Sequence, residues 1–248
     1  MFIPRVYANP DKKIIIFSGA GLDQPSGIQT FRDSNGLWNN HDVDLVCNER
    51  TWKKNFNLVH SFYNDLRNKL STKEPNIAHT KIVDISNKYG KDNVFNITMN
   101  ISDFFERLEL ETLHLHGELT KMECQACGNN WEIGYSEFDV KKDRCPKCNS
   151  LNGVRPKIVF FGGQAPMYTY FSRAIEYLKN TNSIIVVIGT ESSVIHISNI
   201  IEKFKCKKIL CNIDAVKDMK EEQFDIVYHE SIETAIIKIE KDIENIWE

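Results

Sequence analysis

The sequence has 248 residues, a mass of 28.7 kDa, a formal net charge of −3 and a pI near 6.2. This charge balance indicates neither nucleic acid nor an acidic membrane as the main partner, and no apolar stretch has the length of a membrane span. The seven cysteines do not favour a secreted disulfide framework, and the first residues, MFIPRVYANPDKK, contain no apolar signal region. We therefore expect a cytoplasmic protein.

Short, continuously apolar runs predict buried strands, since strands of a parallel sheet are covered on both faces. These runs cover residues 14–17, 93–98, 182–190, 207–214 and 224–229. Helical periodicity lies between them; Leu58, Phe62, Leu66 and Leu70, for example, follow one another at steps of four residues. The predicted helices cover residues 52–70, 78–90, 167–181 and 231–247. This alternation predicts an α/β fold with a Rossmann-like parallel sheet.

Residues 118–153 break this alternation and contain two pairs of cysteines. Each pair is separated by two residues, and the gap between the pairs is 17 residues. The spacing is typical of a structural zinc site, in which four thiolates leave no open position for water. The predicted ligands are Cys124, Cys127, Cys145 and Cys148. We interpret residues 118–153 as a small zinc-ribbon module inserted between residues 1–117 and 154–248, with part of 40–80 as a helical insertion.

The first predicted strand ends in a glycine-rich turn, Gly19-Ala20-Gly21. Such a turn allows backbone amides to approach a pyrophosphate at the start of a helix. The full Rossmann spacing is not met, because Gly27 follows Gly21 by six residues and no acid follows at the usual separation. A plain tight turn therefore remains an alternative to a dinucleotide site.

The longer segment GAGLDQPSGIQTFR, residues 19–32, resembles the opening signature of the sirtuins, the NAD-dependent protein deacylases. Six further segments resemble sirtuin motifs in the same order along the chain. They are PNIAH (75–79), TMNIS (98–102), LHG (115–117), VRPKIVFFGGQAP (154–166), GTESSVIH (189–196) and NID (212–214). The resemblance covers nearly the whole chain.

The resemblance implies NAD as the cofactor and an acyl-lysine protein or peptide as the partner. The residues that it places against NAD are Gly19, Ala20, Gly21, Phe31, Arg32, Asn100, Ile101, Ser102, Gly189, Thr190 and Asn212. It places one side of the peptide cleft at Val159, Phe160, Phe161 and Gly162, where the substrate backbone would add as a strand. The alternative for the two phenylalanines is ordinary core packing.

In the implied reaction, the acyl-lysine oxygen attacks C1′ of the nicotinamide ribose and nicotinamide leaves. A ribose hydroxyl, deprotonated by a histidine, then takes up the acyl group, and water releases lysine and O-acyl-ADP-ribose. The LHG match assigns this base to His116 and places Asn100 beside the ribose and a catalytic water. His114, two residues earlier, is interpreted as a packed or surface histidine.

Several positions depart from the family pattern. They are Asp23, Gln29, Met99, Ser102, Glu191 and His196. Ser102 replaces an aspartate that is expected to hold the nicotinamide amide, and losing such an acceptor costs about 1.5–3 kcal/mol of binding. Asp103, one residue later, is a candidate replacement. Glu191 would place a carboxylate near bound phosphates.

The acyl preference depends on the predicted helix over residues 52–70. Sirtuins that remove acidic acyl groups carry Tyr-x-x-Arg there, whereas this chain has Tyr63, then Leu66 at the arginine position, then Arg67. Tyr63 and Arg67 lie four residues apart and would still converge on a carboxylate. In the alternative that we favour, Leu66 forms an apolar wall, Arg67 extends to solvent, and acetyl or another neutral acyl group is the substrate.

Two other functions remain open on this scaffold. The altered pocket residues are also compatible with an NAD glycohydrolase or an ADP-ribosyltransferase, in which water or another nucleophile takes C1′. A non-catalytic binding module is the third interpretation, which the presence of His116, Asn100 and Arg32 disfavours.

Overall fold

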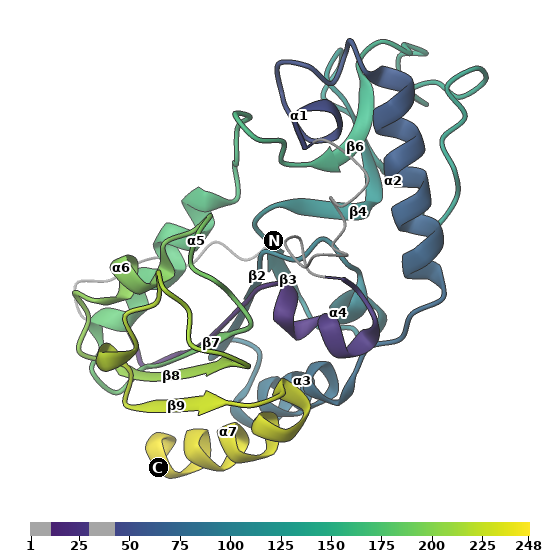
Figure 1. Cartoon of the computed structure of the whole chain (residues 1–248). Coiled ribbons are helices and arrows are strands. Elements are labelled where there is room, and N and C mark those ends of the chain that lie inside the picture. Colours follow the sequence, from purple (N-terminus) through teal and green to yellow (C-terminus); the bar gives the residue numbers. More distant parts are fainter. Residues whose placement is uncertain (1–10, 30–42) are drawn as a thin grey trace.

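The computed structural model describes residues 11–29 and 43–248. Its centre is a six-stranded sheet in the order β3-β2-β1-β7-β8-β9, and every neighbouring pair of strands is parallel (Figure 1). The strands are β1 (Ile14–Ser18), β2 (Val94–Thr98), β3 (Thr112–His114), β7 (Ile184–Ile188), β8 (Lys207–Asn212) and β9 (Ile226–His229). The α/β fold with a parallel sheet is thereby confirmed.

All five predicted strands are present, and each begins within two residues of its predicted start. The central strands β1 and β7 are buried along their whole length, which explains why they contain no polar alternation. The sequence did not predict β3, a three-residue edge strand that is only half-buried over its first two residues. This strand leads directly into the LHG segment.

Helices cover both faces of the sheet (Figure 1). Alternate residues of β1 point to opposite faces, so that Ile14 and Ile16 share a core with α3 and α7, while Ile15 and Phe17 share one with α5 and α6. These helices are α3 (Ile77–Tyr89), α5 (Tyr168–Ile175, continued by a 3-10 turn Glu176–Lys179), α6 (Ile197–Ile201) and α7 (Ile232–Trp247).

A second, smaller layer lies beside the carboxyl edge of the parallel sheet. It is an antiparallel sheet in the order β5-β4-β6, against which α2 packs (Figure 1). Its elements, with the short helices α1 and α4, are α1 (Val43–Val46), α2 (Phe56–Ser71), α4 (Phe104–Arg107), β4 (Gly117–Cys124), β5 (Asn130–Glu132) and β6 (Val154–Ile158). The exact division of the chain into domains stays a prediction.

The helix predicted over residues 52–70 begins four residues later, at Phe56. The residues before it form tight turns, in which the Trp52 N–H donates to the carbonyl of Asn48 at 3.0 Å. The Trp52 side chain is 1% exposed and belongs to the core that α2 shares with β4 and β6. Its burial, rather than helical periodicity, explains the apolar residue at this position.

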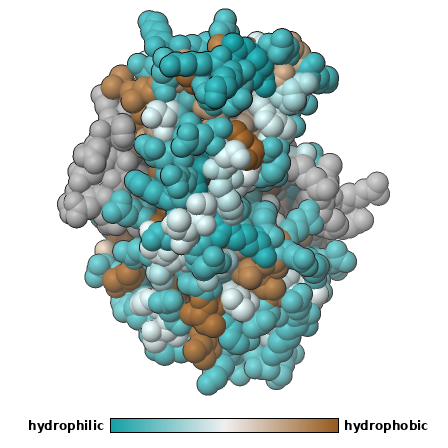
Figure 2. Space-filling view, turned by 90° about the vertical axis from the view of Figure 1, so that its right-hand side faces the viewer, coloured by the Kyte–Doolittle hydropathy of each residue, from teal (hydrophilic) through white to brown (hydrophobic). Residues whose placement is uncertain are grey.

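No helix in the described ranges has the length and the apolar character that crossing a bilayer requires. Figure 2 shows one face of the molecule, on which hydrophobic residues form small groups between hydrophilic ones. This face therefore presents no broad apolar patch.

Two turns at the carboxyl edge of the sheet contact each other through their backbones. The Gly21 N–H donates to the carbonyl of Gly189 at 3.0 Å, so the turn after β1 lies directly on the turn after β7. A Cβ on Gly189 would lie 2.6 Å from the Cα of Gly21, and the φ of Gly189 is +59°. Glycine at both positions is therefore required by the contact between the turns.

We expect Gly189→Ala to destabilise the protein more than Gly134→Ala does. Both glycines have a φ of +59°, but a Cβ on Gly134 meets nothing within 4 Å. The difference between the two variants isolates the close approach, and we expect it to be about 1–3 kcal/mol in the free energy of unfolding. Urea denaturation of both variants measures it, and equal losses would contradict the packing argument.

Candidate active site

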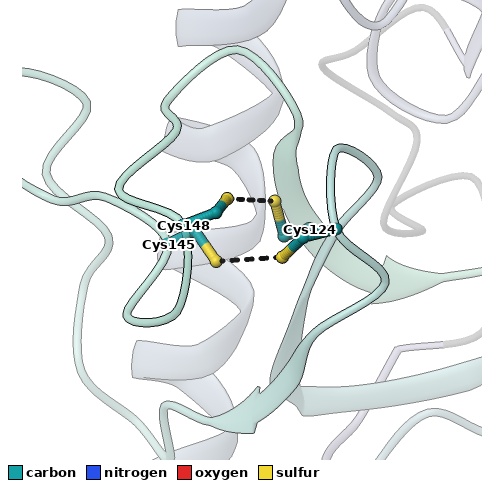
Figure 3. Close-up of side chains that lie close together, drawn as sticks. Cys124, Cys145 and Cys148 are labelled. Atoms are coloured by element: carbon teal, nitrogen blue, oxygen red, sulfur yellow. Dashed lines mark hydrogen bonds between the residues drawn. The ribbon is translucent and has the colours of Figure 1, made fainter.

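The four predicted metal ligands lie together in the smaller layer. The sulfur atoms of Cys124 and Cys148 are 3.7 Å apart, as are those of Cys127 and Cys145, and all four lie within 4.8 Å of one another (Figure 3). A zinc ion with four Zn–S bonds of about 2.3 Å sets its sulfurs about 3.8 Å apart, so the cluster fits a tetrahedral zinc site. It does not fit disulfides, whose sulfurs are bonded at about 2.0 Å.

The local chain explains this arrangement. Cys124 ends β4, and its carbonyl accepts from the N–H groups of Cys127 and Gly128, which closes a tight turn around the first pair. The carbonyl of Cys145 accepts from the N–H of Asn149 at 2.9 Å and closes the equivalent turn around the second pair. With four sulfur ligands no position remains for a reacting water, so a zinc ion here would be structural.

His116 follows β3 and lies at the carboxyl edge of the parallel sheet. Its Nδ1 is 3.1 Å from the carbonyl oxygen of Met99, and its Nε2 is 3.0 Å from the hydroxyl of Tyr168. Because a carbonyl only accepts, Nδ1 carries the proton and Nε2 is left as the basic nitrogen. Burial lowers the pKa of His116 from its ordinary value, more than the bond to Met99 raises it. The imidazole is therefore neutral near pH 7, as a general base requires.

His114 contacts other groups than His116 does and is 6% exposed, so it is a packed histidine, one of the two environments expected from the sequence. Its Nδ1 lies 2.8 Å from the carbonyl of Asn100, and its Nε2 lies 3.0 Å from a carboxylate oxygen of Glu106. Burial alone would lower the pKa of His114, but the bond to Glu106 and its charge outweigh burial, and the net pKa is raised. Both ring nitrogens face acceptors, so His114 is a packed, structural imidazolium.

Asn100 connects the ends of two neighbouring strands. Its side-chain Nδ2 donates to the carbonyl of Gly19 at 3.0 Å, and its N–H donates to the hydroxyl of Thr98, which in turn accepts from the Ser18 hydroxyl. The amide is thus held at the edge where β1 and β2 end. Parallel α/β sheets bind ligands at this edge.

A cavity of about 280 Å³ opens beside Asn100. Four of the residues predicted from the cofactor motifs line it: Ala20, Asn100, Ile101 and Ser102. Leu66 of α2, which the sequence interpreted as an apolar wall, lines it too. The sequence did not predict the other lining residues, which are Lys69 and Leu70 of α2, Lys73 after α2, Asp23, Gly27, Ile28 and Gln29 of the first motif, and Leu119 of β4.

The predicted adenosine-side residues meet across the ends of β7 and β8. The side chain of Asn212 makes two bonds to the backbone of Thr190, accepting from its N–H at 3.0 Å and donating to its carbonyl at 3.1 Å. Gly189 precedes this pair in the turn that contacts Gly21. Asn212 therefore fixes the shape of the loop in this structure.

The two predicted cleft phenylalanines have different environments. Phe160 is 1% exposed and stacks on Tyr63, with 5.9 Å between ring centroids, so it belongs to the core. Phe161 is 50% exposed, and its N–H donates to the carbonyl of Cys47. The N–H of Val159 donates to the carbonyl of His116 at 2.9 Å, so this segment lies directly beside the predicted base. Gly162 follows with a φ of +77°.

Arg67 does not extend to solvent, so that part of the sequence interpretation is wrong. Its side chain is fully buried; Nε donates to the carbonyl of Ser136, Nη1 to that of Leu119, and Nη2 to the side chain of Asn64. Burial lowers the pKa of Arg67 to about 10. With all three nitrogens bonded inside the protein, Arg67 fastens α2 to the smaller layer. Tyr63 is likewise buried, at 2% exposure.

The model of the Sir2 family matches residues 19–196. A Campylobacter jejuni protein named NAD-dependent protein deacylase is 41% identical over 94% of this chain and 97% of its own length. A protein of the same name from Helicobacter hepaticus is 35% identical over 95% of this chain and 98% of its own length. The chain belongs to the Sir2 family, the sirtuins. A solved Sir2 homologue, a mutant in complex with ADP-ribose, superposes with a TM-score of 0.81 at 26% identity, covering 94% of this chain and 92% of the other.

Two of the residues that the sirtuin resemblance implies, Phe31 and Arg32, lie outside the described residues. Two others were missed as site residues. Tyr168 contacts His116 and had no signal beyond its place after the VRPKIVFFGGQAP segment. His79 contacts Asp23, and the PNIAH match to the sirtuin pattern was the signal that pointed to it.

We expect a stoichiometric zinc ion that the fold requires. Cys124→Ser removes one ligand and should abolish zinc retention and lower the melting temperature markedly, since structural zinc contributes about 10–16 kcal/mol in small zinc modules. Metal analysis and thermal denaturation measure both effects. Cys206→Ala is the matched control, because Cys206 is also buried but lies in the core beside α6. A melting curve unchanged by Cys124→Ser would contradict a structural role.

Proposed function

We propose that this sirtuin removes acyl groups from lysine side chains of proteins, with consumption of NAD and release of nicotinamide and O-acyl-ADP-ribose. The observation that carries the proposal is the geometry of His116: its Nδ1 bonds to the carbonyl of Met99, the residue before Asn100, and its Nε2 is left as the basic nitrogen. The names of the two relatives support the same activity. A cytoplasmic location, without membrane or nucleic-acid partners, stays a prediction.

The described residues fit NAD at this edge. Asn100, Thr190 and Asn212 are buried polar groups gathered where three parallel strands end, which is where such sheets bind dinucleotides. A solved Sir2 homologue in complex with NAD superposes with a TM-score of 0.78 at 25% identity. When bound, NAD would supply the ribose carbon C1′, on which the acyl oxygen takes the place of nicotinamide.

Residues of the protein then take up one proton from the cofactor. The carbonyl of Met99 holds the Nδ1 proton of His116, so that Nε2 accepts a proton from a ribose hydroxyl. In the structure Nε2 instead bonds to Tyr168, whose hydroxyl must give way to the ribose. The carbonyl of His116 accepts a hydrogen bond from the N–H of Val159. Val159 lies in the segment where we place the peptide, so the base and the substrate would lie side by side.

We expect nicotinamide release to depend on an acetyl-lysine peptide and to be matched by O-acetyl-ADP-ribose. His116→Ala should reduce this release at least about a hundredfold, the usual contribution of a general base. His229→Ala, the matched control, removes an exposed histidine at the end of β9 that pairs with Glu221 and should leave the rate unchanged. The assay measures nicotinamide with and without peptide.

The other outcomes of this assay would favour the alternative functions. Release without peptide would support the glycohydrolase or ADP-ribosyltransferase alternative. No release, with NAD binding intact, would support a binding module. Unchanged turnover in His116→Ala would remove His116 from the mechanism.

For the acyl group we propose acetyl or another neutral acyl chain. Leu66 lines the cavity beside Asn100. The guanidinium of Arg67 donates its hydrogen bonds to groups inside the protein. Neither side chain therefore offers a cation to an acidic acyl group.

We expect kcat/KM for an acetyl peptide to exceed that for a succinyl peptide by about tenfold or more, the effect of one missing charged hydrogen bond. Leu66→Arg should raise succinyl activity selectively, and Leu66→Met is the matched control of similar volume. A succinyl preference of the unaltered protein would contradict the proposal and would point to Lys69 or Lys73, which line the same cavity.

A further inference from the structure

Asp23 places a buried carboxylate in the wall of the cavity beside Asn100. It is 3% exposed, although it lies in a loop between two single turns of 3-10 helix. Its Oδ1 is 3.2 Å from Nε2 of His79, and its Oδ2 is 2.7 Å from the hydroxyl of Ser102. The sequence marked Asp23 and Ser102 only as two separate departures from the family pattern, and the structure brings them into direct contact.

The partners of Asp23 fix its role as an acceptor. The backbone N–H of Asn76 points at Nδ1 of His79 at 3.2 Å, and since an N–H only donates, Nδ1 carries no proton. The proton therefore sits on Nε2 and is donated to Asp23. The hydroxyl of Ser102 donates its single proton to the other oxygen. Both oxygens of Asp23 thus receive one hydrogen bond each.

The start of α3 holds this arrangement in place. The side chain of Asn76 caps the helix and also donates to the carbonyl of Leu22 at 2.8 Å, next to Asp23. His79 is fully buried, and its ring packs against Phe104 and Phe105 at 5.1 and 5.0 Å between centroids. The orientation of the carboxylate is therefore set by packed side chains on a helix.

Asp23 retains capacity for a ligand. A carboxylate accepts at about four lone-pair positions, and among the described residues His79 and Ser102 occupy two of those of Asp23. Asp23, Ser102 and Asn100 line the same cavity, with Ile101 as an apolar neighbour. A flat ring carrying a primary carboxamide suits such a wall, because the carboxamide N–H groups find a carboxyl acceptor and the ring finds apolar surface.

We propose that Asp23, oriented by His79 and Ser102, is the acceptor for the carboxamide of nicotinamide in this protein. The inference rests on the proposed function. The resemblance expects this carboxylate at position 102, where the chain has serine, and the structure offers one at position 23 in contact with that serine. Asp103, the replacement considered from sequence, instead pairs with Arg107 at 2.9 Å and is bonded by the hydroxyl of Tyr135.

This assignment predicts discrimination between an amide and an acid. A carboxylate at position 23 attracts the N–H of nicotinamide and repels the carboxylate of nicotinic acid. Lys69 and Lys73 line the cavity on the side of α2, so a cavity without the Asp23 charge would accept the acid more readily. A purely structural role for Asp23 would change stability without changing this discrimination.

We expect Asp23→Asn to raise the nicotinamide concentration that halves peptide deacylation by about tenfold or more, as loss of a charged hydrogen bond predicts. In the same variant, inhibition by nicotinamide should exceed inhibition by nicotinic acid by a smaller factor than in the unaltered protein. Asp65→Asn is the matched control, because it removes one exposed carboxylate from α2, and both sensitivities should stay as in the unaltered protein.

The exchange variant Asp23→Ser with Ser102→Asp tests the same idea without removing the carboxylate. It keeps one hydroxyl and one carboxylate in the pair, so nicotinamide sensitivity should return to within about threefold of the original, below the tenfold effect of a lost charged bond. Unchanged nicotinamide sensitivity in Asp23→Asn, or an exchange variant no better than Asp23→Ser alone, would overturn the inference. Failure of the unaltered protein to release nicotinamide would instead refute the proposed function.

Discussion

The site depends on the backbone contact between the turn after β1 and the turn after β7. Gly21 and Gly189 approach closely because neither has a Cβ, and their hydrogen bond aligns the two turns at one edge of the sheet. Asn100 extends the same connection to β2 through the carbonyl of Gly19. Polar groups that are far apart in sequence are thus held together by hydrogen bonds to main-chain groups.

This contact changes the meaning of the glycine-rich segment. The sequence favoured an approach of backbone amides to phosphate, with a plain turn as the alternative. In the structure Gly19 and Gly21 are required by the neighbouring turn itself, since a Cβ on Gly19 would lie 2.7 Å from the carbonyl oxygen of Gly189. The glycines therefore build the edge of the sheet, at which we propose that the cofactor binds.

The sequence predicted the central strands well, because a strand buried on both faces reads as an uninterrupted apolar run. The smaller sheet escaped prediction because β4, GELTKMEC, and β6, VRPKI, mix charged and apolar residues. The motifs also located His116, Asn100 and the four cysteines without revealing their partners.

Partners were not predictable because they come from distant parts of the chain. Asp23 contacts His79 and Ser102, which follow it by 56 and 79 positions in the sequence. No local pattern encodes such pairs. Arg67 is the clearest case. Its place on a helix suggested an exposed side chain, whereas carbonyls of segments that follow much later, at Leu119 and Ser136, draw it inside.

The bond between the carbonyl of His116 and the N–H of Val159 has a mechanical consequence. It fastens the backbone of the base to the residue directly after β6, the strand that pairs with β4, on which Cys124 lies. Gly117 permits this approach, because any side chain there would collide with the carbonyl of Lys157. Paired backbone therefore runs without a break from the base to the cysteine cluster: β4 begins at Gly117, directly after His116, and ends at Cys124.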